Sequence, residues 1–117
     1  TWLPSMQHIA LEGRCFVLTA CQYITRGAFP ADYECELGDA PDTVLMRGGS
    51  AIVDPLGKVL AGPNFTGEDI LFAEIDPQQI KRGKYDFDVA GHYARPDIFS
   101  LQVNTAPARA VVTRPRD

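Results

Sequence analysis

The stretch Arg47–Gly62, RGGSAIVDPLGKVLAG, decides how the middle of the chain folds. Two short apolar runs, at 51–53 and 59–61, flank the tetrapeptide Asp54-Pro55-Leu56-Gly57. Proline presets φ for the second position of a type I turn, aspartate can accept a hydrogen bond from the backbone ahead, and glycine closes the turn without steric cost. The stretch therefore predicts a β-hairpin, a structural motif that by itself indicates no chemistry.

Composition limits the classes of protein to which the chain can belong. Its 117 residues, 45% of them hydrophobic, are enough for one small domain with a core. The net charge of -4 argues against a nucleic-acid partner, and no apolar run approaches the ~20 residues of a membrane span. Three cysteines without paired spacing predict neither a disulfide framework nor a metal site, and they suit a reducing, cytoplasmic location.

The first residues have the periodicity of an amphipathic helix. We expect this helix over 2–12, with Gly13 as its end. Its apolar stripe at i, i+4, i+7 and i+8 consists of Trp2, Met6, Ile9 and Ala10. Leu3 and Leu11 lie off that stripe, which predicts a second apolar patch that another subunit could cover. Because the chain opens on Thr1 within helical sequence, we expect a fragment of a longer protein.

The segments between this helix and the hairpin predict a strand and a loop. Cys15–Cys21 is a near-continuous apolar run, which fits a central strand buried on both faces. Its cysteines are expected to pack as small hydrophobic residues rather than to react. From 22 to 46 the pattern is lost, and prolines, glycines and acidic residues predict a long connection over the surface.

Downstream of the hairpin, the pattern predicts a strand, a helix and a last strand. Asp69–Ile75 is apolar on both faces, and Ile98–Val103 alternates with one polar side. Between them, Asp76 and Pro77 have the types that begin a helix, which we expect over 77–85. The order of elements indicates a layered α/β unit.

Residue types alone point to no catalytic site. No nucleophile signature surrounds a cysteine, no short Cys or His spacing indicates a metal site, and no glycine pair opens a helix after a strand to hold a nucleotide. The carboxylates offer many acid–base pairs and none is singled out. The Cys–His pairs that sequence distance permits combine Cys15, Cys21 or Cys35 with His8 or His92.

Three blocks of sequence carry a family resemblance. The first is MQHIALEGRCFVL followed by TACQ, the second is RGGSAIVDPLGKVLAGPNF continued by 68–76, and the third is KYDFD with GHYARPD. In order and spacing, from Trp2 to about Val103, they resemble the nitrilases of the carbon–nitrogen hydrolase superfamily. The third block is similar to the nitrilase and cyanide-hydrolysing branch rather than to the amidases or carbamoylases.

The resemblance implies the second half of a nitrilase-type α-β-β-α four-layer sandwich. Residues 1–104 would be the C-terminal half of a carbon–nitrogen hydrolase domain, and 105–117 a flexible tail. Family members hydrolyse a nitrile to a carboxylic acid and ammonia through a cysteine thioimidate, with a glutamate and a lysine. In the family these three residues precede the helix expected at 2–12, so we expect no catalytic residue here, no cofactor, no metal and no activity of the chain alone.

The resemblance also implies supporting roles for particular residues. Trp2 matches a tryptophan near the substrate pocket and is expected to line it, although a packing role on the sheet is equally compatible with its position. His92 and Arg95 are expected to hold their loop and the last strand through hydrogen bonds. Subunits would pair into dimers or spiral filaments through the first helix, with Leu3, Gln7 and Leu11 at the interface.

Two alternative functions stay open. The chain could be a non-catalytic half-sandwich that acts as a structural or interaction domain and pairs with itself, since one sheet face would be exposed. It could also belong to a relative that hydrolyses cyanide or an amide instead of a nitrile. The residues present do not indicate whether the nitrile would be aliphatic, aromatic or an arylacetonitrile.

Overall fold

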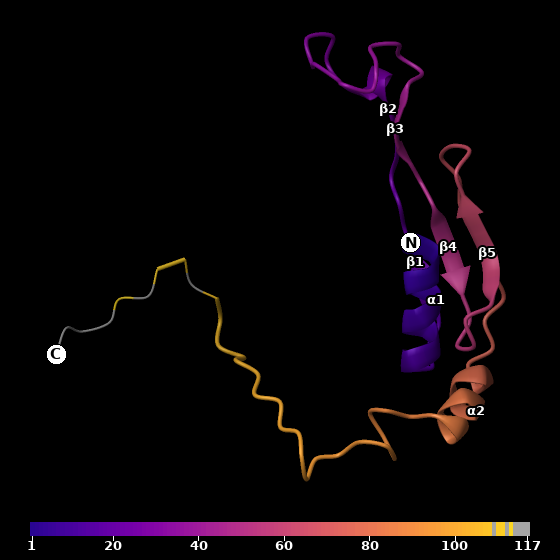
Figure 1. Cartoon of the computed structure of the whole chain (residues 1–117), viewed down its shortest axis with the longest axis vertical. Helices are drawn as coiled ribbons and strands as arrows, with labels where there is room; N and C mark the ends of the chain where they lie inside the picture. The colour runs from indigo at the N-terminus through magenta and orange to yellow at the C-terminus, as the bar shows by residue number, and fades with distance from the viewer. Residues whose placement is uncertain (109, 112, 114–117) are drawn as a thin grey trace.

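The computed structural model describes residues 1–108, 110–111 and 113. Along the chain it forms α1 (Trp2–Gly13), β1 (Val17–Thr19), β2 (Tyr23–Thr25), the short 3-10 helix η1 (Arg26–Ala28), β3 (Val44–Arg47), β4 (Ser50–Val53), β5 (Val59–Asn64) and α2 (Gln78–Asp86). Figure 1 shows α1 beside the sheet that contains β4 and β5, with α2 beyond the turn of the hairpin. The predicted mixed α/β class is confirmed.

The central strand is β4, in a three-stranded antiparallel sheet of order β1-β4-β5. Ile52 lies opposite Leu18 on one side and opposite Ala61 on the other. The prediction of a central strand at 15–21 is wrong, because in the described part of the chain β1 pairs with β4 alone and Leu18 is 64% exposed. A continuous apolar run indicates two faces suited to burial, but it does not reveal how many neighbours a strand has.

The predicted hairpin is confirmed, and the carboxylate of Asp54 holds its turn. One carboxylate oxygen of this buried residue accepts the backbone N–H groups of Leu56 and Lys58, each at 2.9 Å. The backbone N–H of Gly57 donates to the Asp54 carbonyl at 2.9 Å. Gly57 has φ 80°, the left-handed conformation that follows a type I turn in hairpins of this kind. The turn is therefore closed by side-chain and backbone bonds together.

The helix α1 packs against β1 and β4 and closes the small core of the chain. Ala10 of the helix and Val53 of the sheet are 0% exposed, and Ala51 is 1% exposed. The Gln7 side-chain amide donates a hydrogen bond of 2.8 Å to the carbonyl of Gly57. The helix is therefore tied both to the sheet face and to the hairpin turn.

The bounds of α1 agree with the prediction, and its predicted apolar stripe is buried only in part: Ala10 is 0% exposed and Met6 is half-buried. Trp2 and Ile9, expected on that stripe, are 50% and 49% exposed, whereas Gln7 contacts the turn. A polar side chain can lie on the packed face of a helix when it binds a carbonyl there. The spacing of apolar residues alone does not predict such a position. Gly13 is the last helical residue, and Arg14 rather than the glycine takes the left-handed capping conformation, with φ 45°.

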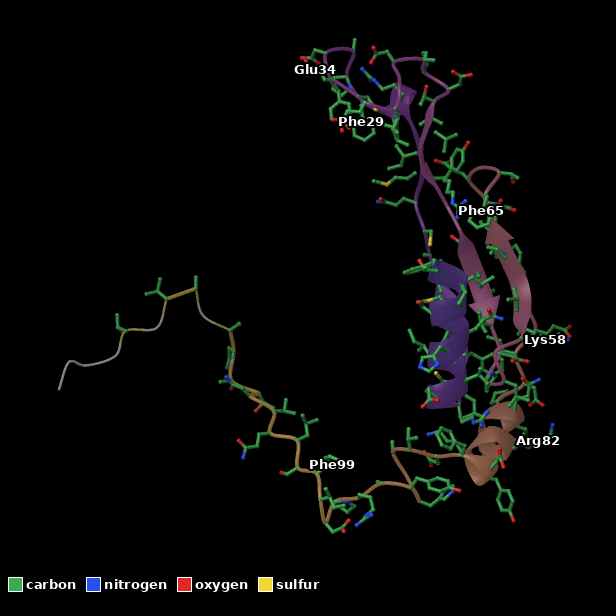
Figure 2. The ribbon with its side chains drawn as sticks, in the orientation of Figure 1. Phe29, Glu34, Lys58, Phe65, Arg82 and Phe99 are labelled. Carbon is green, nitrogen blue, oxygen red and sulfur yellow. The ribbon has the colours of Figure 1, made fainter. Side chains whose placement is uncertain are left out.

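The surface connection predicted from 22 to 46 contains regular structure. β2 pairs with β3 in a two-stranded antiparallel ladder, with Ile24 opposite Met46. The loop between them closes around the guanidinium of Arg26, a residue only 5% exposed. This guanidinium donates to four backbone carbonyls at 2.7–3.3 Å, those of Phe29, Pro30, Ala31 and Tyr33. Figure 2 shows Phe29 and Glu34 on this loop, beyond the end of the main sheet.

Two predicted strands are not formed. Residues 69–75 run beside the sheet without strand pairing, and residues 98–103 carry exposed apolar side chains, among them Phe99 at 76% and Leu101 at 87%. A strand needs a partner that its own sequence does not reveal. The helix predicted at 77–85 is confirmed as α2, where Asp76 Oδ1 accepts the backbone N–H of Gln78 at 2.9 Å.

The molecule is open. Its radius of gyration is 21.3 Å, whereas a compact domain of this length has about 13 Å. On the sheet face opposite α1, Leu18 is 64% exposed and the nearby Ile70 is 72% exposed, whereas Ile52 between the two neighbouring strands is only 9% exposed. Residues after α2 lead away from the sheet (Figure 1). The tail predicted at 105–117 includes residues 109, 112 and 114–117, which lie outside the described residues.

The replacement Gly57→Val is expected to destabilise the fold by about 2 to 4 kcal/mol. A side chain at this positive φ is strained, and its Cβ would lie 3.1 Å from the side chain of Leu11. Urea unfolding measures the loss, with Leu56→Ala, in the same turn but 63% exposed, as the control. Equal stability of the two variants would show that the turn does not organise the fold.

The replacement Arg26→Met keeps the apolar stem and removes all four carbonyl bonds. Amide hydrogen exchange over residues 29–33 is expected to accelerate by about tenfold or more. Arg47→Met is the control, because the Arg47 guanidinium lies over the Phe65 ring, 4.5 Å from its centroid, at the end of β3 and not at the carbonyls that Arg26 binds. Unchanged exchange in Arg26→Met would mean that the loop is held by other contacts.

Candidate functional site

A polar hollow opens where β1 ends and β4 begins. Its walls come from Cys21 and Tyr23, from Gly48 and Ser50, and from the end of β5 with residues 67–71. Its volume is about 160 Å³. A water occupies roughly 30 Å³ and ligand pockets usually exceed about 300 Å³, so the hollow fits a group of several atoms rather than a whole ligand.

Ser50 joins the two strands that form the floor of the hollow. Its hydroxyl accepts the backbone N–H of Cys21 at 2.9 Å and lies 3.4 Å from the Cys21 carbonyl, to which it donates. The backbone N–H of Gly48 donates to the Gln22 carbonyl at 3.0 Å. These bonds fix the end of β1 against the start of β4, so the floor is built by the sheet itself.

Asn64 shapes the opposite wall. Its Oδ1 accepts both the backbone N–H and the hydroxyl of Thr66, at 2.9 and 2.8 Å, and its Nδ2 donates to the Gly67 carbonyl at 3.3 Å. The resulting turn places the exposed carboxylates of Glu68 and Asp69 along the hollow. Figure 2 shows Phe65 at this end of β5 and Lys58 at the other, so the hollow and the hairpin turn lie at opposite ends of the sheet.

The structure places Trp2 at the beginning of α1. Because Gln7 ties the helix to the hairpin turn, α1 begins towards the other end of the sheet, the end with the polar hollow (Figure 1). Trp2 is half-exposed and is not among the residues that line this hollow. Its role in a substrate pocket stays a prediction.

The three residues predicted at a subunit interface lie on α1. Gln7 donates to the Gly57 carbonyl, and the side chain of Leu11 lies against Gly57 while remaining 39% exposed. Leu3 is half-buried. Within the chain, Gln7 and Leu11 therefore contact the hairpin turn, and their role between subunits stays a prediction.

His92 and Arg95 lie in the turns that follow α2. Arg95 forms a two-bond ion pair with Asp97, with Nε to Oδ1 at 2.8 Å and Nη2 to Oδ2 at 2.6 Å. The hydrogen bonds from Arg95 lower the pKa of the Asp97 carboxyl. The His92 ring lies 4.5 Å from the ring of Tyr93. These contacts join neighbouring residues, and the role of the two residues in holding their loop stays a prediction. The strand that they were expected to hold is not formed at 98–103.

Sequence reasoning missed the contact that joins α2 to α1. Arg14 lies 5.3 Å from the centroid of the Phe87 ring and 3.7 Å from the Asp86 carboxylate. The Arg14 side chain is 14% exposed, and its stem contacts the buried Gly83. No local pattern indicates such a contact, because it joins residues about 70 positions apart through one long side chain.

The described residues contain no group of three His, Cys, Asp or Glu side chains that could hold a metal ion. The three cysteines are half-buried and unpaired by disulfides. In the part of the chain that the structure covers, no helix is long and apolar enough to cross a membrane.

Comparison with known proteins defines the class. Residues 1–85, which include α1, the hollow and all of α2 except its last residue, match the family model described as carbon-nitrogen hydrolase. The chain belongs to the carbon–nitrogen hydrolase family, as the three sequence blocks predicted.

The individual proteins that the chain resembles are named nitrilases. Over 113 residues it is 73% identical to a protein named nitrilase from Bradyrhizobium diazoefficiens, covering 97% of this chain and 35% of the relative. It is 60% identical to an aliphatic nitrilase from Sinorhizobium fredii, covering 97% and 37%, respectively. It is 49% identical to an arylacetonitrilase from Trametes versicolor, covering 92% and 34%. The chain thus spans about a third of the length of these relatives.

The ion pair between Arg95 and Asp97 predicts how the pKa of the Asp97 carboxyl changes when the arginine is removed. Above the ordinary range of an aspartate carboxyl the pair is intact, and it is lost as the pH falls through the lowered pKa of Asp97. In Arg95→Gln the pKa of Asp97 is expected to rise towards its usual value, as measured by NMR titration of the carboxyl carbon. Arg82→Gln is the control and should leave Asp97 unchanged; the same Asp97 pKa in wild type and Arg95→Gln would contradict the pairing.

Proposed function

We propose that this chain is part of a nitrilase that hydrolyses a nitrile to a carboxylic acid and ammonia. The observation that carries the proposal is the identity of 73% and 60% to two proteins named nitrilase, along 97% of the chain in each case. Since the chain spans about a third of those relatives, we propose that residues outside these 117 supply the chemistry.

In the proposed reaction, a cysteine thiolate attacks the nitrile carbon and a proton is transferred to the nitrogen, which gives a thioimidate. Water adds, ammonia leaves, and a second water releases the carboxylic acid from the cysteine. A glutamate would act as the base, and a lysine would stabilise the charge that develops on nitrogen. Cys15, Cys21 and Cys35 are followed by Phe16, Gln22 and Glu36 instead of the Trp-Glu of the nucleophile motif. We therefore propose that this chain contains no nucleophile and is inactive alone.

The proposed contribution of the chain is one helix layer and one sheet layer of a four-layer α-β-β-α sandwich. The open sheet face supports this proposal. An apolar hollow of about 280 Å³ lies on that face, with Leu18, Ile52, Ile70 and Leu71 among its lining residues. In the proposed sandwich a second sheet would cover it, because burial of apolar surface contributes about 25 cal/mol per Å².

The proposal includes a homo-oligomer, a dimer or a spiral filament, that pairs through α1. The outward side chains of this helix support it, since Trp2 and Ile9 are about half exposed. A cytoplasmic location is also proposed, because three cysteines without disulfides suit a reducing compartment.

Ammonia release tests the proposed function. The longer protein that contains this chain is incubated with aliphatic, aromatic and arylacetonitrile substrates, and with cyanide and the matching amides. Ammonia and carboxylic acid are expected from at least one nitrile, and the 117-residue chain alone is expected to release none. Cys35→Ser in the longer protein should leave the rate unchanged, because Cys35 is not the proposed nucleophile.

The other possible results of the ammonia-release assay would each contradict one part of the proposal. If the longer protein hydrolyses cyanide or amides but none of the nitriles, the proposed substrate class is wrong. No hydrolysis by a folded longer protein would favour the non-catalytic interaction domain. Nitrile hydrolysis by the isolated chain, or loss of activity in Cys35→Ser, would contradict the proposed division of roles.

A further inference from the structure

A further cavity lies between the hairpin turn and α2. Its volume is about 360 Å³, and ligand pockets usually exceed about 300 Å³. Figure 2 shows Lys58 beside the turn and Arg82 on α2, the two elements that border the cavity. The lining residues come from the turn and from one face of the helix, and they are Asp54, Leu56, Gln79, Arg82, Gly83 and Asp86.

The carboxylate of Asp54 is the buried charge of this cavity. The residue is only 7% exposed, and its Oδ1 accepts the backbone N–H groups of Leu56 and Lys58. No hydrogen bond or ion pair among the described residues reaches its other oxygen, Oδ2. Burial of a carboxylate without a cationic partner is costly, so buried carboxylates are normally paired. The structure therefore leaves one oxygen of a buried charge without its usual partner.

The other charged groups of the cavity already have partners. The Asp86 carboxylate lies 3.7 Å from Arg14, and its side chain is 85% exposed. Arg82 lies 3.9 Å from Asp76 and is 76% exposed, so this guanidinium pairs with a carboxylate other than Asp54. Among the described residues, the charge of the lining that stays uncompensated is that of Asp54.

The chemistry of the lining favours a cation that donates N–H groups. A carboxylate oxygen accepts hydrogen bonds, and those from ammonium and guanidinium groups are charge-assisted and strong. The apolar side chain of Leu56, which is 63% exposed, borders the same cavity and offers a surface for an alkyl stem. A metal ion fits less well, because the described residues contain no group of three His, Cys, Asp or Glu side chains that could ligate it.

We propose that this cavity binds a primary ammonium or guanidinium group, with its charge on Asp54 Oδ2 and its alkyl stem on Leu56. The source of the group is a Lys or Arg side chain from outside the described residues, or a free alkyl cation. In both cases the occupant joins the hairpin turn to α2. Binding at this site does not depend on nitrile hydrolysis, so either proposal can fail without the other.

Calorimetric titration of the longer protein that contains this chain tests for a free cation. The probes are butylguanidinium and butylurea, which share a shape but differ in charge. Butylguanidinium is expected to bind at least about tenfold more tightly than butylurea. In Asp54→Asn, whose amide oxygen can keep both hydrogen bonds of the turn, this preference should disappear. Asp69→Asn is the matched control and should retain the preference, because Asp69 Oδ1 also accepts a backbone N–H but the residue does not line the cavity.

A crystal structure of the longer protein tests for a side chain. If the protein itself supplies the cation, a Lys or Arg nitrogen from outside the described residues is expected within about 3.2 Å of Asp54 Oδ2, and neither probe should bind. Equal or absent binding of the two probes, with no such nitrogen at Oδ2, would overturn the proposal. A preference for butylguanidinium that Asp54→Asn retains, or Arg82 turned onto Oδ2, would also overturn it.

Discussion

The arrangement of this chain depends on the turn that Asp54 and Gly57 close. The Asp54 carboxylate binds two backbone N–H groups across the turn, which joins β4 to β5. The same turn receives the side-chain amide of Gln7 and lies against Leu11, which positions α1 over the sheet. These contacts with the turn and the packing of α1 on β1 and β4 together hold the helix on one face of the sheet. The opposite face is left open.

That division gives the two ends and the two faces of the sheet different roles. The end with the turn is packed, with Arg14 joining α2 to α1 nearby. The other end carries the polar hollow, built by Ser50 and Asn64. One face has a core around Val53 and Ala10, and the other has exposed apolar side chains. A chain with a small core and an open apolar face is suited to pack against further layers of protein.

Local chemistry explains which parts of this fold could be predicted from the sequence. The hairpin and the beginning of α2 rest on aspartate, proline and glycine acting on their immediate neighbours, and both are confirmed. The paired strands β2 and β3 and the loop around Arg26 were missed, because a buried guanidinium satisfies carbonyls in a way that no periodicity encodes. The strands predicted at 69–75 and 98–103 are not formed. A strand needs a partner strand to pair with, and the sequence of the segment does not reveal one. The hollow was missed because its residues converge from distant segments.

The central claim is that residues outside this chain cover its open sheet face in a nitrilase. Carbene footprinting of the isolated chain and of the longer protein tests it most directly. Leu18 and Ile70 are 64% and 72% exposed in the chain, and Leu56, at 63%, lies in the hairpin turn as an internal reference. The account predicts that labelling of Leu18 and Ile70 falls by more than about half in the longer protein while Leu56 changes little. Equal labelling of Leu18 and Ile70 in both proteins would contradict it.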